Sequence, residues 1–67
     1  MKKIIGLILK YHREKRNLSQ DYIADKLNTD KQYISNIETG RKNITIEQLE
    51  LVLKAMGVEI KDVLKIK

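Results

Sequence analysis

The sequence predicts a compact all-α domain built from five short helices. Apolar residues recur at spacings of three and four, which is the pattern of helices that bury one face. No proline occurs anywhere in the chain, and no stretch shows the strict alternation typical of a strand. The 67 residues suffice for one modest hydrophobic core, and there is no internal repeat or linker. We therefore expect residues 1–67 to form a single domain.

The first predicted helix runs from about Lys3 to Arg16 and ends at Asn17, because Asn tolerates the left-handed conformation that closes helices. Ser19 then has the place and chemistry of an N-cap, whose hydroxyl accepts a hydrogen bond from a free backbone N–H group. It opens a second helix over residues 20–27. The side chains that we expect this helix to bury are Ile23, Ala24 and Leu27.

Only three residues separate the second helix from the third. Asn28 suits a positive φ at the turn, and Asp30 is a good N-cap for a helix over residues 31–39, which Gly40 ends. Two short helices joined by so short a turn cross at a steep angle. The segment of about residues 19–39 is therefore predicted to be a helix-turn-helix unit.

The fourth helix begins at Thr45, which forms a predicted capping box with Gln48, and Gly57 ends it. A short fifth helix is expected from about Ile60 to Leu64. The predicted buried stripe of the fourth helix consists of Ile46, Leu49, Val52, Leu53 and Met56.

The third helix has an unusual polar face. Ile34 and Ile37 are its aliphatic residues and lie one turn apart, so they must point inward. A solvated helix face typically carries Glu and Lys pairs, whereas here the outward positions carry amide and hydroxyl groups that can hydrogen-bond to base edges in the major groove. The alternative is a polar surface helix without such a role. The candidate base-reading residues are Lys31, Gln32, Tyr33, Ser35 and Asn36.

Two further sites suit contacts to DNA phosphates. Gln20 lies in the first turn of the second helix, where its amide and the free backbone N–H groups can hold an anion. Arg41, Lys42 and Asn43 form a polar loop directly after the third helix. A solvated basic loop is the alternative interpretation of these three residues.

The charge distribution is consistent with a nucleic-acid partner but does not establish one. The chain carries a net charge of +5, with +5 on residues 1–16, −2 on residues 17–40 and +2 on residues 41–67. There is one His, no Cys and no acidic cluster with metal-ligand spacing, so we expect neither an enzyme nor a protein with a metal, a cofactor or a small-molecule ligand. No apolar run approaches the roughly 20 residues that span a membrane, so we expect no membrane partner.

The segment LSQDYIADKL at residues 18–27 and the segment YISNIETGRKN at residues 33–43 resemble two motifs of the Xre/Cro repressor-type helix-turn-helix family. The resemblance extends from about Ile5 to Leu64. It implies a five-helix lambda-repressor-like fold, with Gln20 on a phosphate and the third helix in the major groove. It also implies a structural ion pair between Arg13 and Glu38. The absence of cysteine suits a reducing cytoplasm, where we expect the protein to act.

The chain departs from the family pattern at three positions. Asn28 replaces the usual glycine of the turn, Ile44 replaces the usual proline after the loop, and His12 occupies a position that is usually aliphatic. Asn28 is a tolerable replacement by conformation, and we interpret His12 as a partly buried structural residue. The segment from Gln32 to Glu50 also resembles the small controller proteins of restriction–modification systems.

These features predict a sequence-specific transcriptional regulator of double-stranded DNA, acting as a repressor on a pseudo-palindromic operator as a homodimer. The alternatives are an antitoxin that neutralises a partner protein and a restriction–modification controller that activates or represses. Several apolar residues remain once the core is filled, and a dimer interface is one use for them. Ile60 and Val63 have the equal alternative of capping the monomer core. The candidate interface residues are Leu51, Val58, Ile60, Val63 and Ile66.

Overall fold

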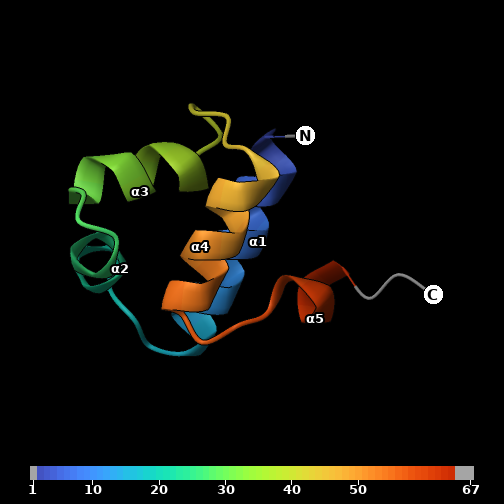
Figure 1. Cartoon of the computed structure of the whole chain (residues 1–67). Coiled ribbons are helices and arrows are strands. Elements are labelled where there is room, and N and C mark those ends of the chain that lie inside the picture. The colour runs from blue at the N-terminus through green and yellow to red at the C-terminus, as the bar shows by residue number, and fades with distance from the viewer. Residues whose placement is uncertain (1, 65–67) are drawn as a thin grey trace.

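A computed structural model of the chain describes residues 2–64 and shows five helices (Figure 1). Ile66 of the predicted dimer interface lies outside these residues. The all-α, five-helix prediction is confirmed, and the predicted helix ends agree to within a residue or two. Among the described residues there is no strand. The helices are α1 (Lys2–Lys15), α2 (Gln20–Lys26), α3 (Lys31–Glu38), α4 (Ile46–Ala55) and α5 (Ile60–Leu64).

Three helices begin at the N-caps that the sequence predicts. The Ser19 hydroxyl accepts a hydrogen bond of 3.0 Å from the backbone N–H three residues later, and the Asp30 carboxylate does the same at 2.9 Å. Thr45 and Gln48 form the reciprocal capping box, because each backbone N–H donates to the other side chain, at 3.0 and 3.1 Å. These bonds satisfy N–H groups that the first turn of a helix leaves without partners.

The turns between helices rely on residues with positive φ. Asn17 and Asn28 both adopt φ 56°, and Gly40 adopts φ 78° after α3. The turn at Asn28 sets α2 and α3 at a steep angle, so Figure 1 looks down the axis of α2 while α3 lies across the view. The predicted helix-turn-helix geometry is therefore present.

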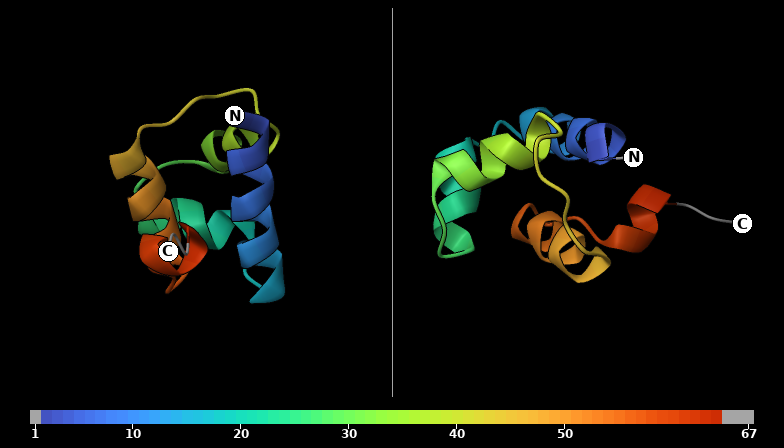
Figure 2. Two further views of the ribbon diagram at one scale, coloured as in Figure 1. Left: turned by 90° about the vertical axis from the view of Figure 1, so that its right-hand side faces the viewer. Right: turned by 90° about the horizontal axis from the view of Figure 1, so that it is seen from above.

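The hydrophobic core lies where α1, α2, α3 and α4 meet. Seen from above, α1 and α3 lie on one side of the molecule and α4 and α5 on the other (Figure 2). No other described helix covers the outer side of α3 in this view. The buried apolar residues are Leu9, Ile23, Ala24, Ile34, Ile37, Leu49, Val52, Leu53, Met56 and Val58.

Two predictions about apolar residues are wrong in the structure. Ile46 is 63% exposed, because the first turn of α4 projects past the core and the buried stripe starts only at Leu49. Val58 is 6% exposed and belongs to the core of the single chain, so little of its surface is left for a dimer contact. Ile60 and Val63 are half-buried and pack against the same core, as the alternative interpretation expected.

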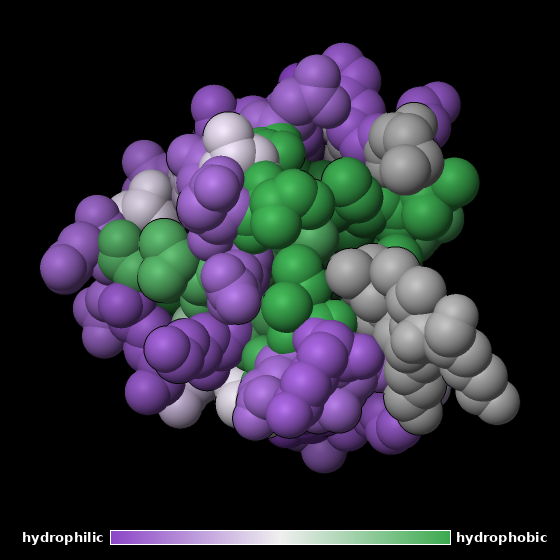
Figure 3. Space-filling view, turned by 45° about the vertical axis from the view of Figure 1, so that its right-hand side comes forward, coloured by the Kyte–Doolittle hydropathy of each residue, from purple (hydrophilic) through white to green (hydrophobic). Residues whose placement is uncertain are grey.

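Some apolar surface remains exposed to solvent. Figure 3 shows part of it near the centre of one face of the molecule, with a smaller separate patch on the left of the view. No described helix is both long enough and apolar enough to cross a membrane. The large apolar side chains that are mostly exposed are Ile4, Leu7, Tyr11, Tyr22, Ile46 and Leu51.

Candidate nucleic-acid interface

The outer face of α3 presents amide side chains in a fixed relation to one another. Ile34 and Ile37 are each 1% exposed and anchor the opposite face in the core. Gln32 and Asn36 lie one turn apart, and the Gln32 Nε2 atom donates a hydrogen bond of 3.0 Å to the Asn36 Oδ1 atom. That bond orients both amides and leaves the Gln32 carbonyl oxygen and the Asn36 amino group free to bind elsewhere.

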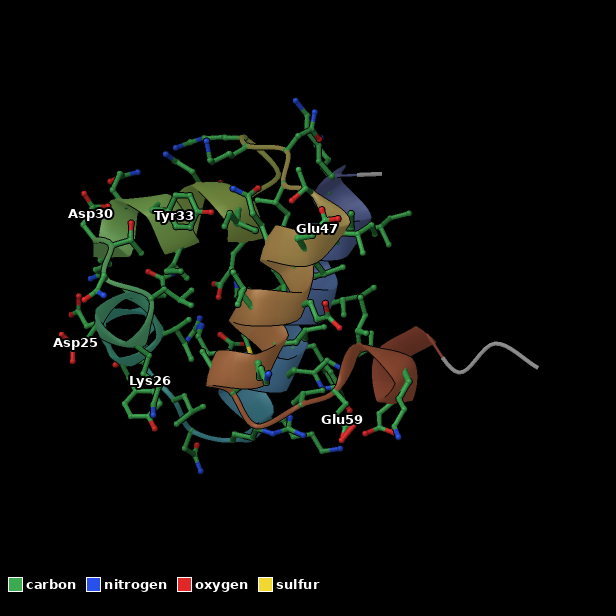
Figure 4. The ribbon with its side chains drawn as sticks, in the orientation of Figure 1. Asp25, Lys26, Asp30, Tyr33, Glu47 and Glu59 are labelled. Carbon is green, nitrogen blue, oxygen red and sulfur yellow. The ribbon has the colours of Figure 1, made fainter. Side chains whose placement is uncertain are left out.

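The other predicted base-reading residues take different places around α3. Lys31 is exposed near the start of the helix, and Ser35 is half-buried on one flank. Tyr33, labelled in Figure 4, lies on the opposite flank of α3. Its ring packs against the core and lines a hollow together with Leu51 of α4. Lys42 holds its ammonium group 5.6 Å from the centre of this ring. The structure thus groups Lys31, Gln32, Ser35 and Asn36, and it places Tyr33 at the edge of the group.

A buried ion pair fixes the last turn of α3 against α1. The Arg13 guanidinium donates to both carboxylate oxygens of Glu38, with Nε to Oε2 at 2.6 Å and Nη2 to Oε1 at 3.0 Å. Its Nη1 atom donates to the Leu18 carbonyl oxygen at 2.7 Å. The side chains are 11% and 3% exposed, and the hydrogen bond to Glu38 raises the pKa of Arg13. The pairing that the family resemblance implied is therefore present as a two-point interaction.

Gln20 joins this network at the start of α2. Its Nε2 atom donates to Glu38 Oε1 at 3.0 Å. An amide nitrogen carries two hydrogens, so one N–H of Gln20 remains for another acceptor. The bond to Glu38 holds the side chain beside the C-terminal end of α3 and so orients the remaining donor.

The loop after α3 is tied to the helix through its backbone, and its side chains are exposed to solvent. The backbone N–H groups of Arg41 and Lys42 both donate to the Asn36 carbonyl oxygen, at 2.9 and 3.1 Å. The side chains of Arg41, Lys42 and Asn43 are exposed. The structure thus brings the predicted phosphate-contacting loop to the end of the predicted base-reading helix.

Comparison with known protein families identifies the family to which a chain with this helix arrangement belongs. The family model described as helix-turn-helix matches residues 9–63, which is most of the chain. The chain belongs to the helix-turn-helix family. The matched residues include the whole of α2 and α3, and α3 is the one with an uncovered polar face.

Individual members of the helix-turn-helix family resemble the chain over most of its length. The control protein C.BamHI of Bacillus amyloliquefaciens is 40% identical over 50 residues, which cover 75% of this chain and 62% of that protein. The crystal structure of the clp gene regulator ClgR from Corynebacterium glutamicum matches with a TM-score of 0.88 at 28% identity, over 96% of this chain and 83% of that one. The chain thus spans less than two thirds of the control protein.

A third relative was solved together with DNA. It is the restriction–modification controller protein C.Esp1396I, whose tetramer in complex with its natural 35 base-pair operator matches with a TM-score of 0.86. The two chains are 32% identical, and the match covers 94% of this chain and 83% of that one. The predicted similarity to the controller proteins is therefore confirmed.

Sequence reasoning missed one residue that positions the helix-turn-helix unit. Gly6 of α1 is buried where α1 crosses the end of α3, and a Cβ atom there would stand 2.6 Å from the Glu38 carbonyl oxygen. Only glycine lets the two backbones approach this closely. A glycine within a predicted apolar helix was the available signal, because such a glycine often marks a close packing contact.

Proposed function

We propose that the chain is a transcriptional regulator that reads a specific double-stranded DNA site with the outer face of α3. One observation carries the proposal: Gln32 and Asn36 are hydrogen-bonded to each other on an uncovered helix face whose opposite side is locked in the core. Membership of the helix-turn-helix family supports it, as do relatives that are a gene regulator and a restriction–modification controller protein.

In this proposal α3 lies in the major groove and its amides contact base edges. Gln and Asn form bidentate hydrogen bonds with adenine, each worth about 1–3 kcal/mol of discrimination against the wrong base. Lys31 adds a contact near the start of α3, and Ser35 adds one on the flank of the same face. The free N–H of Gln20 and the loop of residues 41–43 hold backbone phosphates, which set the register of α3 in the groove.

We further propose that two copies bind together, because one such domain reads too few base pairs to select a unique site. A two-fold dimer on a pseudo-palindrome solves this problem. Leu51 is 56% exposed on α4, and two hollows of about 180 and 290 Å³ beside it are both lined by Leu27 and Leu51. We place Leu51 at the centre of the interface, with Ile60 and Val63 contributing the surface that the core leaves exposed.

Repression by covering a promoter is the simplest outcome of operator binding, and it requires no catalysis. Such a regulator acts on DNA in the cytoplasm. The controller relatives favour one variant of the same function, in which the chain regulates the genes of a restriction–modification system. An antitoxin with a protein target is the remaining alternative from the sequence.

Selection of bound duplexes from a random DNA pool tests the proposal. We expect enrichment of a two-fold symmetric sequence whose half-sites lie about one DNA turn apart. We also expect the affinity of the enriched duplex to fall steeply with salt. If no sequence is enriched above the starting pool, the fold serves another partner, and the proposal is wrong.

A further inference from the structure

A hollow of about 350 Å³ lies between α1 and the C-terminal end of α3, outside the residues assigned above to DNA contacts. We propose that this hollow is a second phosphate site, in which Lys3 and Lys10 hold the DNA backbone. The inference rests on the proposed function, because it extends the same interface. The residues that line the hollow are Lys3, Leu7, Lys10, Glu38 and Thr39.

The hollow adjoins the phosphate-contacting loop directly. A Cβ atom at Gly40 would stand 2.7 Å from Lys3 Cγ and 3.1 Å from Lys3 Cα, so the stem of Lys3 lies against Gly40. Arg41 follows Gly40 in the chain, and its side chain is exposed. Because Lys3 is exposed as well, a strand that contacts the loop passes within reach of its ammonium group.

The electrostatics of the hollow favour an anion. Glu38 is the one acidic residue of its lining, and its side chain is 3% exposed. Both of its carboxylate oxygens already accept hydrogen bonds, from Arg13 and Gln20. Lys3 and Lys10 are exposed at the rim of the hollow, so it presents two cations and a neutralised carboxylate.

The order of residues on α1 matches the chemistry of a DNA strand. Lys3, Leu7 and Lys10 lie on one face of the helix, and the two lysines are about 10.5 Å apart along its axis. Leu7 is 63% exposed between them. A DNA strand presents phosphates separated by deoxyribose, whose carbon atoms can cover an apolar side chain. The row therefore offers two phosphate contacts with an apolar contact to the sugar between them.

An anionic membrane is the other partner that a row of lysines and apolar residues fits. The position of the row favours DNA. It lies at the end of α3, and its Glu38 is bonded to Gln20, the predicted phosphate contact of α2. A duplex bound to α3 reaches this row without a second binding event.

The salt dependence of binding to the selected duplex tests the inference. The variants are Lys3→Gln and Lys10→Gln, and the matched control is Lys15→Gln. Lys15 is exposed on the same helix but points about 140° away from Lys10, at about 100° per residue, and it lies over the Tyr11 ring. All three changes remove one charge from an exposed position of α1, and we expect each variant to keep the helical circular dichroism spectrum of the unaltered chain.

We expect Lys3→Gln and Lys10→Gln each to reduce the slope of log K against log salt by about 0.9, without changing which duplexes are preferred. Lys15→Gln keeps the slope of the unaltered chain. If all three variants show the same slope, the second phosphate site does not exist, although the proposed function stands. Failure of the unaltered chain to prefer any duplex would instead remove the proposed function.

Vesicles of phosphatidylglycerol distinguish the two anionic partners. We expect the chain to bind them no more tightly than the Lys3→Gln and Lys10→Gln variants do. If the two variants lose vesicle binding while their DNA slopes stay unchanged, the row is a membrane site and the inference is overturned.

Discussion

Gly6 of α1 lies against the backbone of Glu38, and a Cβ atom at Gly6 would stand 2.6 Å from the Glu38 carbonyl oxygen. About two turns further along α1, Arg13 binds the Glu38 carboxylate at two points. The last turn of α3 is therefore held by α1 through its main chain and through its side chain. The first helix sets the angle at which the polar face of α3 meets a partner.

Replacing Gly6 with alanine should destabilise the fold. The added methyl group has no space, and overpacking of this kind costs about 1–3 kcal/mol. We expect the melting temperature to fall by several degrees for each kcal/mol, since the domain is small. Leu7→Ala is the control, because that side chain is 63% exposed on the same helix. Equal melting temperatures for the two variants would contradict the close contact.

Removing the positive partner of Glu38 should be more damaging. Arg13→Met leaves the Glu38 carboxylate buried without its cation, which costs about 3–5 kcal/mol in comparable pairs. Urea denaturation measures this loss. Lys15→Met is the matched control, because it removes an exposed cation from the same helix.

A double variant shows whether the loss comes from the unpaired carboxylate. Arg13→Met with Glu38→Leu replaces the buried pair by apolar groups, and we expect it to recover most of the stability. A double variant that is less stable than Arg13→Met alone would show that the ion pair stabilises the fold in its own right.

The stability of the fold should depend on pH through His12. Its pKa lies below the ordinary value of 6.5, first because burial disfavours the charged ring and then because Arg16 and Lys15 are close. The Arg16 Nη1 atom is also 3.3 Å from His12 Nδ1. The unfolded chain therefore takes up a proton near pH 6.5 that the folded chain resists, so the free energy of unfolding falls as the pH drops through 6.5.

His12→Gln removes this titration. Urea midpoints measured between about pH 5.5 and 7.5 should decline with falling pH in the unaltered chain and stay flatter in the variant. Two parallel curves would show that His12 does not contribute.

Association of two copies should depend on Leu51. We expect the unaltered chain to be a dimer in light scattering at micromolar concentration. Leu51→Glu should be a folded monomer, because a dimer of this variant would have to bury the new charge at its interface. Ile4→Glu alters a similarly exposed residue of α1 and should leave the dimer intact. A Leu51→Glu chain that still has the mass of two copies would place the interface elsewhere.

The parts of the fold that depend on local chemistry were predictable from the sequence. Ser19, Asp30 and Thr45 cap their helices, and Asn17 and Asn28 close theirs, because caps and turns require particular residues next to one another in the chain. The spacing of apolar residues then identified the buried faces. The general location of the α3 polar face followed from the same periodicity.

The remaining features depend on which elements meet in space. Tyr33 has a position on α3 that suits base contacts, and only the structure shows that its ring also packs against the core and lines a hollow beside α4. Val58 follows the end of a helix, and the local sequence does not show whether it is exposed or buried. In the structure it is buried in the core of the single chain. Glu38 alone gave no sign of burial, and only the family resemblance connected it with Arg13. Side-chain periodicity cannot supply such long-range contacts.

Base recognition by α3 is the central claim, and one measurement tests it most directly. The affinity of Gln32→Ala is compared with that of the unaltered chain, on the selected duplex and on duplexes carrying each single-base change. We predict a loss of about 1–3 kcal/mol of binding free energy on the selected duplex. At one base-pair position the variant should bind all four base pairs equally well, while its preferences at the other positions stay unchanged. If Gln32→Ala weakens every duplex by the same factor, α3 does not read bases through this residue, and the account is contradicted.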